Sequence, residues 1–249
     1  MGESTLTTAG RPAGSDELAD RAHALQLAVY ARILSADPAD PDSAVRHFAT
    51  GLGRINDRLA VLERATRSVV YGLNMRALFD PLRREREPDL HSRARGILGH
   101  SMTNPNGHLS LVAAASPDMW VAPVRTTGIV VDERLGLFPG PPGPAGEATA
   151  WLCRDEDLIA QFCELWWATK RQAVPIHDVP GVVPLSERQL AVAGLLSQGA
   201  KDATIARRLG VSLRTVSNDV GRLLDSFGVG TRWEAGMVLG RACPPELLA

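Results

Sequence analysis

The stretch "GVSLRTVSNDVGRLLDSFGV", residues 210–229, predicts a strongly amphipathic helix with an acidic residue, Asp219, in its middle. On a wheel of about 100° per residue, one side is apolar, with Leu213, Val216, Val220, Leu223, Leu224 and Phe227. Arg214, Asn218 and Arg222 follow one another at four-residue steps on the opposite side, as one exposed row. Arginine pairs with guanine edges or phosphates and asparagine with adenine, so this row predicts contact with a nucleic acid groove.

Three more short helices surround this one. Ser186 predicts the cap of a helix that Gly199 ends, and Leu185 and Leu190 predict a hydrophobic staple around that cap. A second helix is predicted from Lys201 to Leu209. Ser212 is expected to cap the helix 212–227, and Thr231 a fourth helix through "RWEAGMVLGRA". Residues 185–249 are therefore predicted to form an all-α four-helix domain.

This text, "LSERQLAVAGLLSQGAKDATIARRLGVSLRTVSNDVGRLLDSFGVGTRWEAG", closely resembles the LuxR/NarL-type helix-turn-helix. The matching positions are Leu185, Glu187, Arg188, Leu195, Gly199, Ile205, Ala206, Leu209, Ser212, Thr215, Val216, Arg232 and Ala235. The resemblance implies that the helix 212–227 enters the major groove of double-stranded DNA and that the fourth helix helps to pair subunits. It implies a homodimer that reads a two-fold site, with contacts from Lys201, Ser212, Arg214, Thr215, Ser217, Asn218 and Arg222.

Four positions depart from the family pattern and remove phosphate contacts. Ser217, Asp219 and Gly221 replace residues that are commonly Lys, His and basic, and Asp202 replaces a phosphate-contacting Asn. Each lost contact removes roughly one released counterion, so both the affinity and its salt dependence are expected to be reduced. Asp219 lies on the flank of the wheel, where Arg222 or Arg208 is its expected partner. An alternative therefore stays open, in which the domain is a protein-interaction module that mainly dimerises or captures another regulator.

The charge balance agrees weakly with a nucleic acid partner at the C-terminal end. The whole chain has a net charge of −1, but residues 184–249 hold eight Lys and Arg against six Asp and Glu. The three cysteines have neither disulfide nor metal-ligand spacing, so we expect buried free thiols. The sequence shows no apolar run of about 18 residues and no secretory signal at its start, so we expect a cytoplasmic protein without membrane contact.

The N-terminal part is predicted in four pieces: a mobile tail over residues 1–15, a helical segment over 16–67, an α/β domain with a mixed sheet over 68–178, and a linker over 179–184. Two apolar stripes define the helical segment, namely Leu18, Ala22, Leu25, Val29 and Ile33, then Phe48, Leu52, Ile55, Leu59 and Leu62. Short apolar runs predict strands at 68–74, 95–103, 118–124, 127–132, 134–138 and 148–153. Helices are expected at 75–86, 106–115 and 155–172.

A phosphorylated receiver domain is not expected, because it needs an acidic pair, a further Asp and a Lys after strands, and Lys170 and Lys201 are the only lysines. In the order and texture of its elements, the region 68–172 instead resembles the sensory domain of actinobacterial LuxR-type regulators. That domain is related to the phospholipase D-like fold of TrmB-type regulators. The resemblance implies that a small-molecule effector or a protein partner is sensed here.

Catalysis by a phospholipase D-type route is not expected, because it needs a His, a Lys two residues on and a later Asp. His91, His100 and His108 are followed at that spacing by Arg93, Met102 and Ser110. An enzyme with another active site stays a minor alternative, and no cofactor and no metal is expected. Asp132 is interpreted as a turn former, and the tryptophans as core or as the lining of an apolar pocket, at Trp120, Trp151, Trp166 and Trp167.

Overall fold

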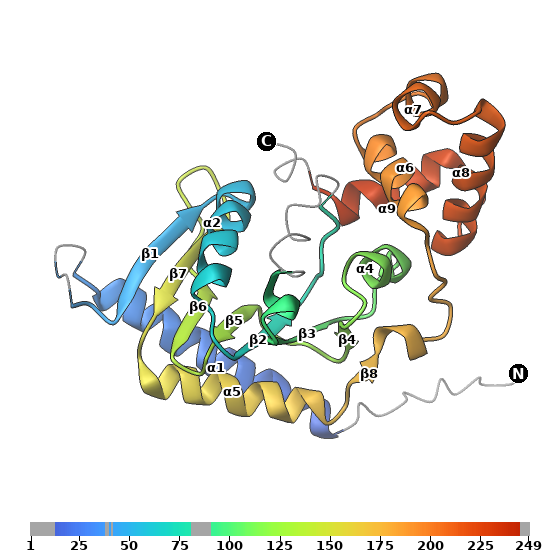
Figure 1. The fold of residues 1–249 in the computed structure, drawn as a ribbon. Coiled ribbons are helices and arrows are strands. Elements are labelled where there is room, and N and C mark those ends of the chain that lie inside the picture. Colours follow the sequence, from blue (N-terminus) through green and yellow to red (C-terminus); the bar gives the residue numbers. More distant parts are fainter. Residues whose placement is uncertain (1–12, 38–39, 41, 81–90, 245–249) are drawn as a thin grey trace, which may run out of the picture.

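The computed structural model describes residues 13–37, 40, 42–80 and 91–244 (Figure 1). Its N-terminal part has these elements in chain order: α1 Ala13–Ser35, β1 Val45–Thr50, α2 Leu52–Ala65, β2 Val69–Asn74, β3 Leu98–Thr103, α4 Leu109–Ala115, β4 Trp120–Val121, β5 Gly128–Val131, β6 Leu135–Pro139, β7 Thr149–Cys153, α5 Glu156–Lys170, β8 Val174–Pro175 and the 3-10 turn η1 Ile176–Asp178. Four helices follow: α6 Glu187–Ser197, α7 Asp202–Leu209, α8 Leu213–Phe227 and α9 Arg232–Ala242. None of these helices combines the length and apolar character needed to cross a bilayer.

The strands form one eight-stranded mixed sheet in the order β1-β7-β6-β5-β2-β3-β4-β8. The β2–β3 and β3–β4 pairs are parallel and the other pairs are antiparallel. The mixed α/β sheet followed by an all-α domain confirms the predicted fold class. All six predicted strand segments contain a strand, and the predicted helix 155–172 contains α5.

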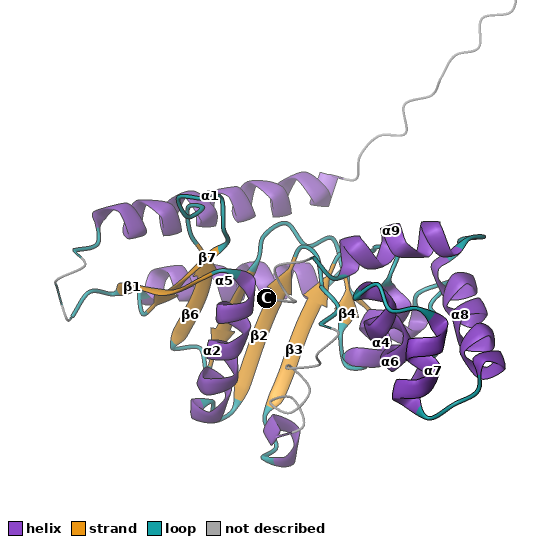
Figure 2. Cartoon of the chain, turned by 90° about the horizontal axis from the view of Figure 1, so that it is seen from above, coloured by secondary structure: helices purple, strands orange, loops and turns teal. Residues whose placement is uncertain are grey.

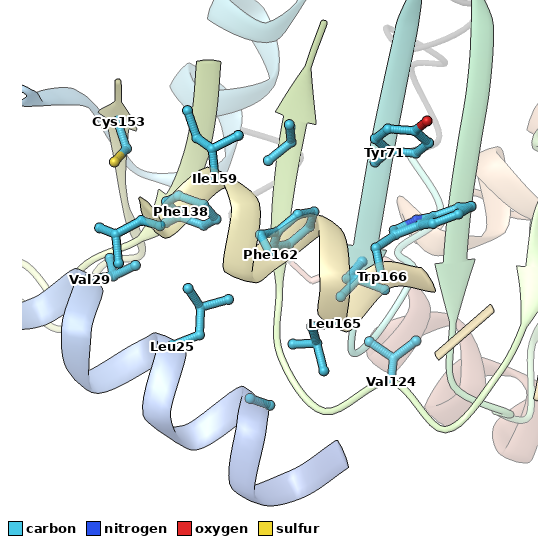
Figure 3. Packing of buried hydrophobic residues seen from close by; sticks show 14 of the residues in the cluster. Leu25, Val29, Tyr71, Val124, Phe138, Cys153, Ile159, Phe162, Leu165 and Trp166 are labelled. Carbon is cyan, nitrogen blue, oxygen red and sulfur yellow. The ribbon is translucent and has the colours of Figure 1, made fainter. Parts of the chain in front are cut away.

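Helices cover both faces of the sheet because side chains alternate along each strand. Phe138 packs in the same cluster as Phe162 of α5, while its neighbour Leu137 packs in a cluster with Leu59 of α2. Figure 3 shows Leu25 and Val29 of α1 directed toward the side chains of α5. The apolar stripe predicted for residues 18–33 is therefore a real helix face, buried against α5 and the sheet.

The predicted helical segment 16–67 is wrong in its middle. Phe48 does not belong to a helix stripe but lies in β1, which pairs antiparallel with β7. The helix α2 begins only at Leu52, after Gly51 at φ 89°. Phe48 precedes Leu52 by four residues, so it mimics a helical repeat, but pairing with a strand about 100 residues later decides its structure.

Other boundaries also move. Residues 75–80 of the predicted helix 75–86 are not helical, and the rest of it lies outside the described residues. The predicted tail 1–15 lies mostly outside them too, while α1 already begins at Ala13. The helix expected at 106–115 is α4, which begins at Leu109.

The helical C-terminal part is docked on the sheet domain (Figure 2). Phe79 and Leu111 of the N-terminal part lie in the same buried cluster as Leu190, Ile205 and Leu239. The Phe79 backbone N–H donates to the Ala242 carbonyl at 2.8 Å, and Arg76 donates to the neighbouring carbonyl of Arg241. The end of α9, whose carbonyls lack partners within the helix, therefore receives donors from the segment after β2.

Candidate nucleic-acid interface

The helix α8 begins and ends at the residues that its sequence predicts. The Ser212 hydroxyl accepts the Thr215 backbone N–H at 3.1 Å, which caps the helix. Gly228 ends it in the left-handed conformation at φ 66°. Val216, Leu223 and Phe227 are buried against the other helices. Leu213 is an exception to the predicted apolar side, because its side chain is 58% exposed; it is the first residue of the helix, beyond the edge of the core.

The predicted polar row is on the surface of α8. Arg214, Asn218 and Arg222 are all exposed. A hollow of about 800 Å³ lies in front of this helix and is lined by Thr215, Asn218 and Arg222 on one side. The opposite side is formed by residues 184–189, which are the segment before α6 and the first residues of that helix. The structure thus brings three of the seven predicted contacts around one open space.

Asp219 does not face this surface as a free carboxylate. It is 3% exposed and is packed between the buried positions Val216 and Leu223, one helical turn to either side. Arg188 of α6 donates from Nε to its Oδ2 at 2.7 Å and from Nη2 to its Oδ1 at 3.4 Å. The expected partners Arg222 and Arg208 were wrong, because a partner 31 residues away lies closer in space.

The same hydrogen bond and the charge of Asp219 raise the pKa of the Arg188 guanidinium above its ordinary value. A buried carboxylate is strongly destabilising without such a partner. Arg188 is the partner of Asp219 that the sequence does not predict. It matched the family pattern, but no local signal connected it with position 219.

Asp202, the second acidic departure, is also neutralised by an arginine. Arg232 of α9 forms an ion pair with it and donates to the Ala200 carbonyl at 3.2 Å. These contacts join the start of α7 to α9. Neither acidic replacement therefore presents an uncompensated charge.

The remaining predicted contacts are exposed but lie outside the hollow. Lys201 occupies the N-cap position of α7 without a side-chain capping bond, and Ser217 is exposed on α8. Ser212 uses its hydroxyl for the cap and lies 2.9 Å from the Thr215 hydroxyl. At Gly221 an added Cβ would meet no atom within 4 Å. Packing therefore does not require the glycine that replaces the family's basic residue.

The chemistry-bearing residues of the N-terminal part have structural roles. His108 Nε2 donates to the Ala77 carbonyl at 2.8 Å, and burial lowers the pKa of its ring. Trp166 is buried and donates to the His100 carbonyl at 3.2 Å, whereas Trp167 is half exposed. Cys153 of β7 is buried and forms no disulfide, and burial raises the pKa of its thiol. Among the described residues, no group of three or more His, Cys, Asp or Glu side chains is placed to hold a metal ion.

Comparison with known families places the four helices in one of them. Residues 183–239 match GerE, the bacterial regulatory proteins of the luxR family. The matched range covers α6 to α8 and most of α9. It therefore contains the hollow, the polar row and the Arg188–Asp219 pair.

A curated relative extends beyond this range. The chain is 25% identical over 148 residues to the bialaphos biosynthetic pathway regulatory protein of Streptomyces hygroscopicus. The alignment covers 57% of this chain and 57% of the relative, so the chain spans little more than half of that protein's length. Both comparisons thus lead to bacterial regulatory proteins, the luxR family for residues 183–239 and a pathway regulator for the longer alignment.

Solved structures with some similarity include an archaeal protein and an enzyme-family member. TrmBL2, an archaeal chromatin protein, has a TM-score of 0.41 and 13% identity, covering 64% of this chain and 63% of its own. Nuc from Salmonella typhimurium, a phospholipase D family member, has a TM-score of 0.39 and 12% identity, covering 52% of this chain and 95% of its own. The solved structures with some similarity to this chain thus include a phospholipase D family member. What the geometry and the family match establish together is that residues 183–239 form a helix-turn-helix domain of the luxR family of bacterial regulatory proteins.

Proposed function

We propose that the protein is a DNA-binding transcriptional regulator that reads a two-fold DNA site through α8. The observation that carries the proposal is the surface of α8, on which Arg214, Asn218 and Arg222 are exposed in one row while Asp219 is buried and paired. Such a row supplies phosphate and base-edge donors without a repelling carboxylate between them. The proposed contacts also include Lys201, Ser212, Thr215 and Ser217.

The paired acids weaken the case for a pure interaction module. That alternative was based on Asp219 and Asp202 as charges that repel phosphate. Each carboxylate instead receives an arginine. Neither acid therefore presents an unpaired negative charge to a DNA phosphate.

A homodimer through α9 fits the two-fold site. Trp233 is 78% exposed and Met237 is 49% exposed on the outer face of this helix. Gly236 and Gly240 are exposed on the same face, at helical spacing from the two large side chains. Two small residues beside two large apolar ones suit close approach of a second helix.

The N-terminal α/β domain is proposed to sense a small-molecule effector or a protein partner, without catalysis or a bound cofactor. The physical support is its direct contact with the helical domain. Phe79 reaches the core of the helices, and α4 packs beside it through Leu111. A change in the sheet domain that moves the segment after β2 would thus reach α9. We place the linker between the two parts at 179–184.

The test is DNA binding by the full chain and by three single variants, Arg214→Ala, Asn218→Ala and Arg222→Ala. The duplex is first enriched from a random DNA pool by the parent protein, and binding is then measured by fluorescence anisotropy. We expect each variant to lose about 1–3 kcal/mol of binding free energy, roughly a 5- to 150-fold weaker Kd. No enrichment of any duplex, or three variants that bind as the parent does, would refute the function.

Dimerisation is tested separately by sedimentation of the parent and of Trp233→Glu. We expect a dimer for the parent and a shift toward monomer for the variant. A variant that sediments as the parent does would place the dimer contact elsewhere.

A further inference from the structure

The hollow in front of α8 is lined by a positively charged side chain, Arg188, that is not among the predicted DNA contacts. Arg188 lies at the start of α6 and lines this space together with Asn218 and Arg222 of α8. Its side chain is half exposed, whereas that of its partner Asp219 is almost fully buried. The arginine is therefore the outward member of the pair, and the carboxylate is the inward one.

The pairing geometry leaves part of the guanidinium available. The contacts with Asp219 run through Nε and Nη2, on one edge of the planar group. Arginine has five N–H donors in a fixed fork, so the edge formed by Nη1 and Nη2 still has donors for a second oxyanion. A phosphate accepts such a fork through two charge-assisted hydrogen bonds.

The buried carboxylate also restricts the arginine. An exposed arginine loses much side-chain entropy when it is ordered on a ligand. Arg188 is already ordered by Asp219 in the free protein, because burial makes that pairing obligatory for the carboxylate. Less entropy then remains to be lost on binding.

We propose that Arg188 binds a phosphate of the DNA backbone and that Asp219 is the positioning residue that holds it there. The inference rests on the proposed DNA-binding function and adds a contact to the same site. A phosphate is the favoured target because Arg188 projects from α6, beside the reading helix, and contacts from flanking elements position the protein on the backbone. The cation absent from position 219 of α8 is thus supplied from α6.

The test is the double variant Arg188→Gln/Asp219→Asn, which keeps the net charge of the chain and leaves no buried charge without a partner. Its affinity is measured by fluorescence anisotropy for the enriched duplex and for a shuffled duplex, over a series of salt concentrations. We expect similar losses on both duplexes and a salt-dependence slope lower by about one counterion. A slope equal to that of the parent overturns the proposal, as does a loss confined to the enriched duplex, which would mark a base contact.

Two further variants separate the possible failures. Arg134→Gln removes an exposed cation from the β5–β6 hairpin and should leave the slope unchanged. Arg188→Lys keeps the ion pair but not the fork, so its affinity should fall on both duplexes; parent-like affinity would overturn the proposal even where the double variant does not fold. If Arg214→Ala weakens binding while the double variant does not, only the Arg188 contact is wrong. If no duplex is enriched at all, the proposed function fails and this contact fails with it.

Discussion

At the scale of single residues, the reading helix carries a glycine that its packing does not need. Gly221 lies in the interior of α8 in ordinary helical backbone, with open space where a Cβ would stand. Glycine in a helix interior is unfavourable because it loses the most backbone entropy on folding. The glycine therefore weakens the helix that carries the proposed DNA contacts.

Gly221→Ala is expected to stabilise the folded protein by about 0.8–1 kcal/mol, as measured by urea denaturation. Gly228→Ala is the matched control at the end of the same helix, where φ is 66° and a Cβ is strained. That variant should destabilise by about 1 kcal/mol or more. Equal effects of the two substitutions would contradict the reasoning.

Asp219 and Gly221 are both departures from the family's basic pattern, yet their structures differ completely. Asp219 is buried and paired with Arg188, whereas a Cβ added at Gly221 would meet no atom within 4 Å. The residue type at a position therefore does not show whether another residue supplies the lost positive charge.

At the scale of elements, the β5–β6 hairpin depends on one carboxylate. Asp132 and Glu133 both have positive φ, at 52° and 54°, which is the two-residue turn that the right-handed twist of strands favours. The Asp132 carboxylate accepts the backbone N–H groups of Arg67, Ser68 and Val69 at 2.8–3.2 Å. The predicted turn former is confirmed, and it also ties the hairpin to the start of β2.

These bonds make the stability of the hairpin depend on pH. Burial acts to raise the pKa of Asp132, but the bonds from Ser68, Arg67 and Val69 outweigh it, and the pKa lies below its ordinary value of 3.8. A lowered folded pKa means that the carboxylate contributes stability above about pH 4 and that this contribution is lost as the pH falls through the folded pKa.

We therefore expect Asp132→Asn to flatten the fall in stability below pH 4, measured as the urea midpoint at pH 7 and pH 3. Asparagine tolerates the left-handed backbone, so the turn is kept. Asp20→Asn removes an exposed carboxylate on α1 and is the control for the loss of one negative charge. A parent and an Asp132→Asn profile that run parallel would show that the carboxylate bonds add nothing.

At the scale of the whole molecule, residues of the sheet domain form part of the hydrophobic core of the helical domain. Phe79 is 1% exposed and lies in the cluster of the helices, although it follows β2 in the chain. Its backbone N–H donates a hydrogen bond to the Ala242 carbonyl at the end of α9. The two parts are therefore expected to be coupled in stability.

Phe79→Ala should cost about 3–5 kcal/mol through the lost side chain and the cavity it leaves. We expect amide hydrogen exchange to accelerate in α6 and α9 and to stay slow in β2 and β3. Phe162→Ala is the matched control, since this residue is equally buried but packs between α5 and the sheet. It should open the sheet domain instead. Unchanged exchange in α6 and α9 of Phe79→Ala would show that the two parts are energetically separate.

The sequence by itself determined the helix-turn-helix. The caps at Ser186, Ser212 and Thr231 and the buried stripe of α8 depend on residues within about one helical turn, so local patterns report them directly. The exposed row of Arg214, Asn218 and Arg222 follows from the same helical period.

Only the tertiary structure decided which residues distant in the chain became partners. Phe48 became a strand residue by pairing β1 with β7, and Asp219 found Arg188 across 31 residues. Phe79 joined a core built by another domain. No local pattern encodes such partners, because they are brought together by the packing of elements and not by their spacing in the chain. The fold therefore decided which charged side chains lie at the surface in front of α8. The local sequence decided that α8 forms and that Arg214, Asn218 and Arg222 lie on its exposed face.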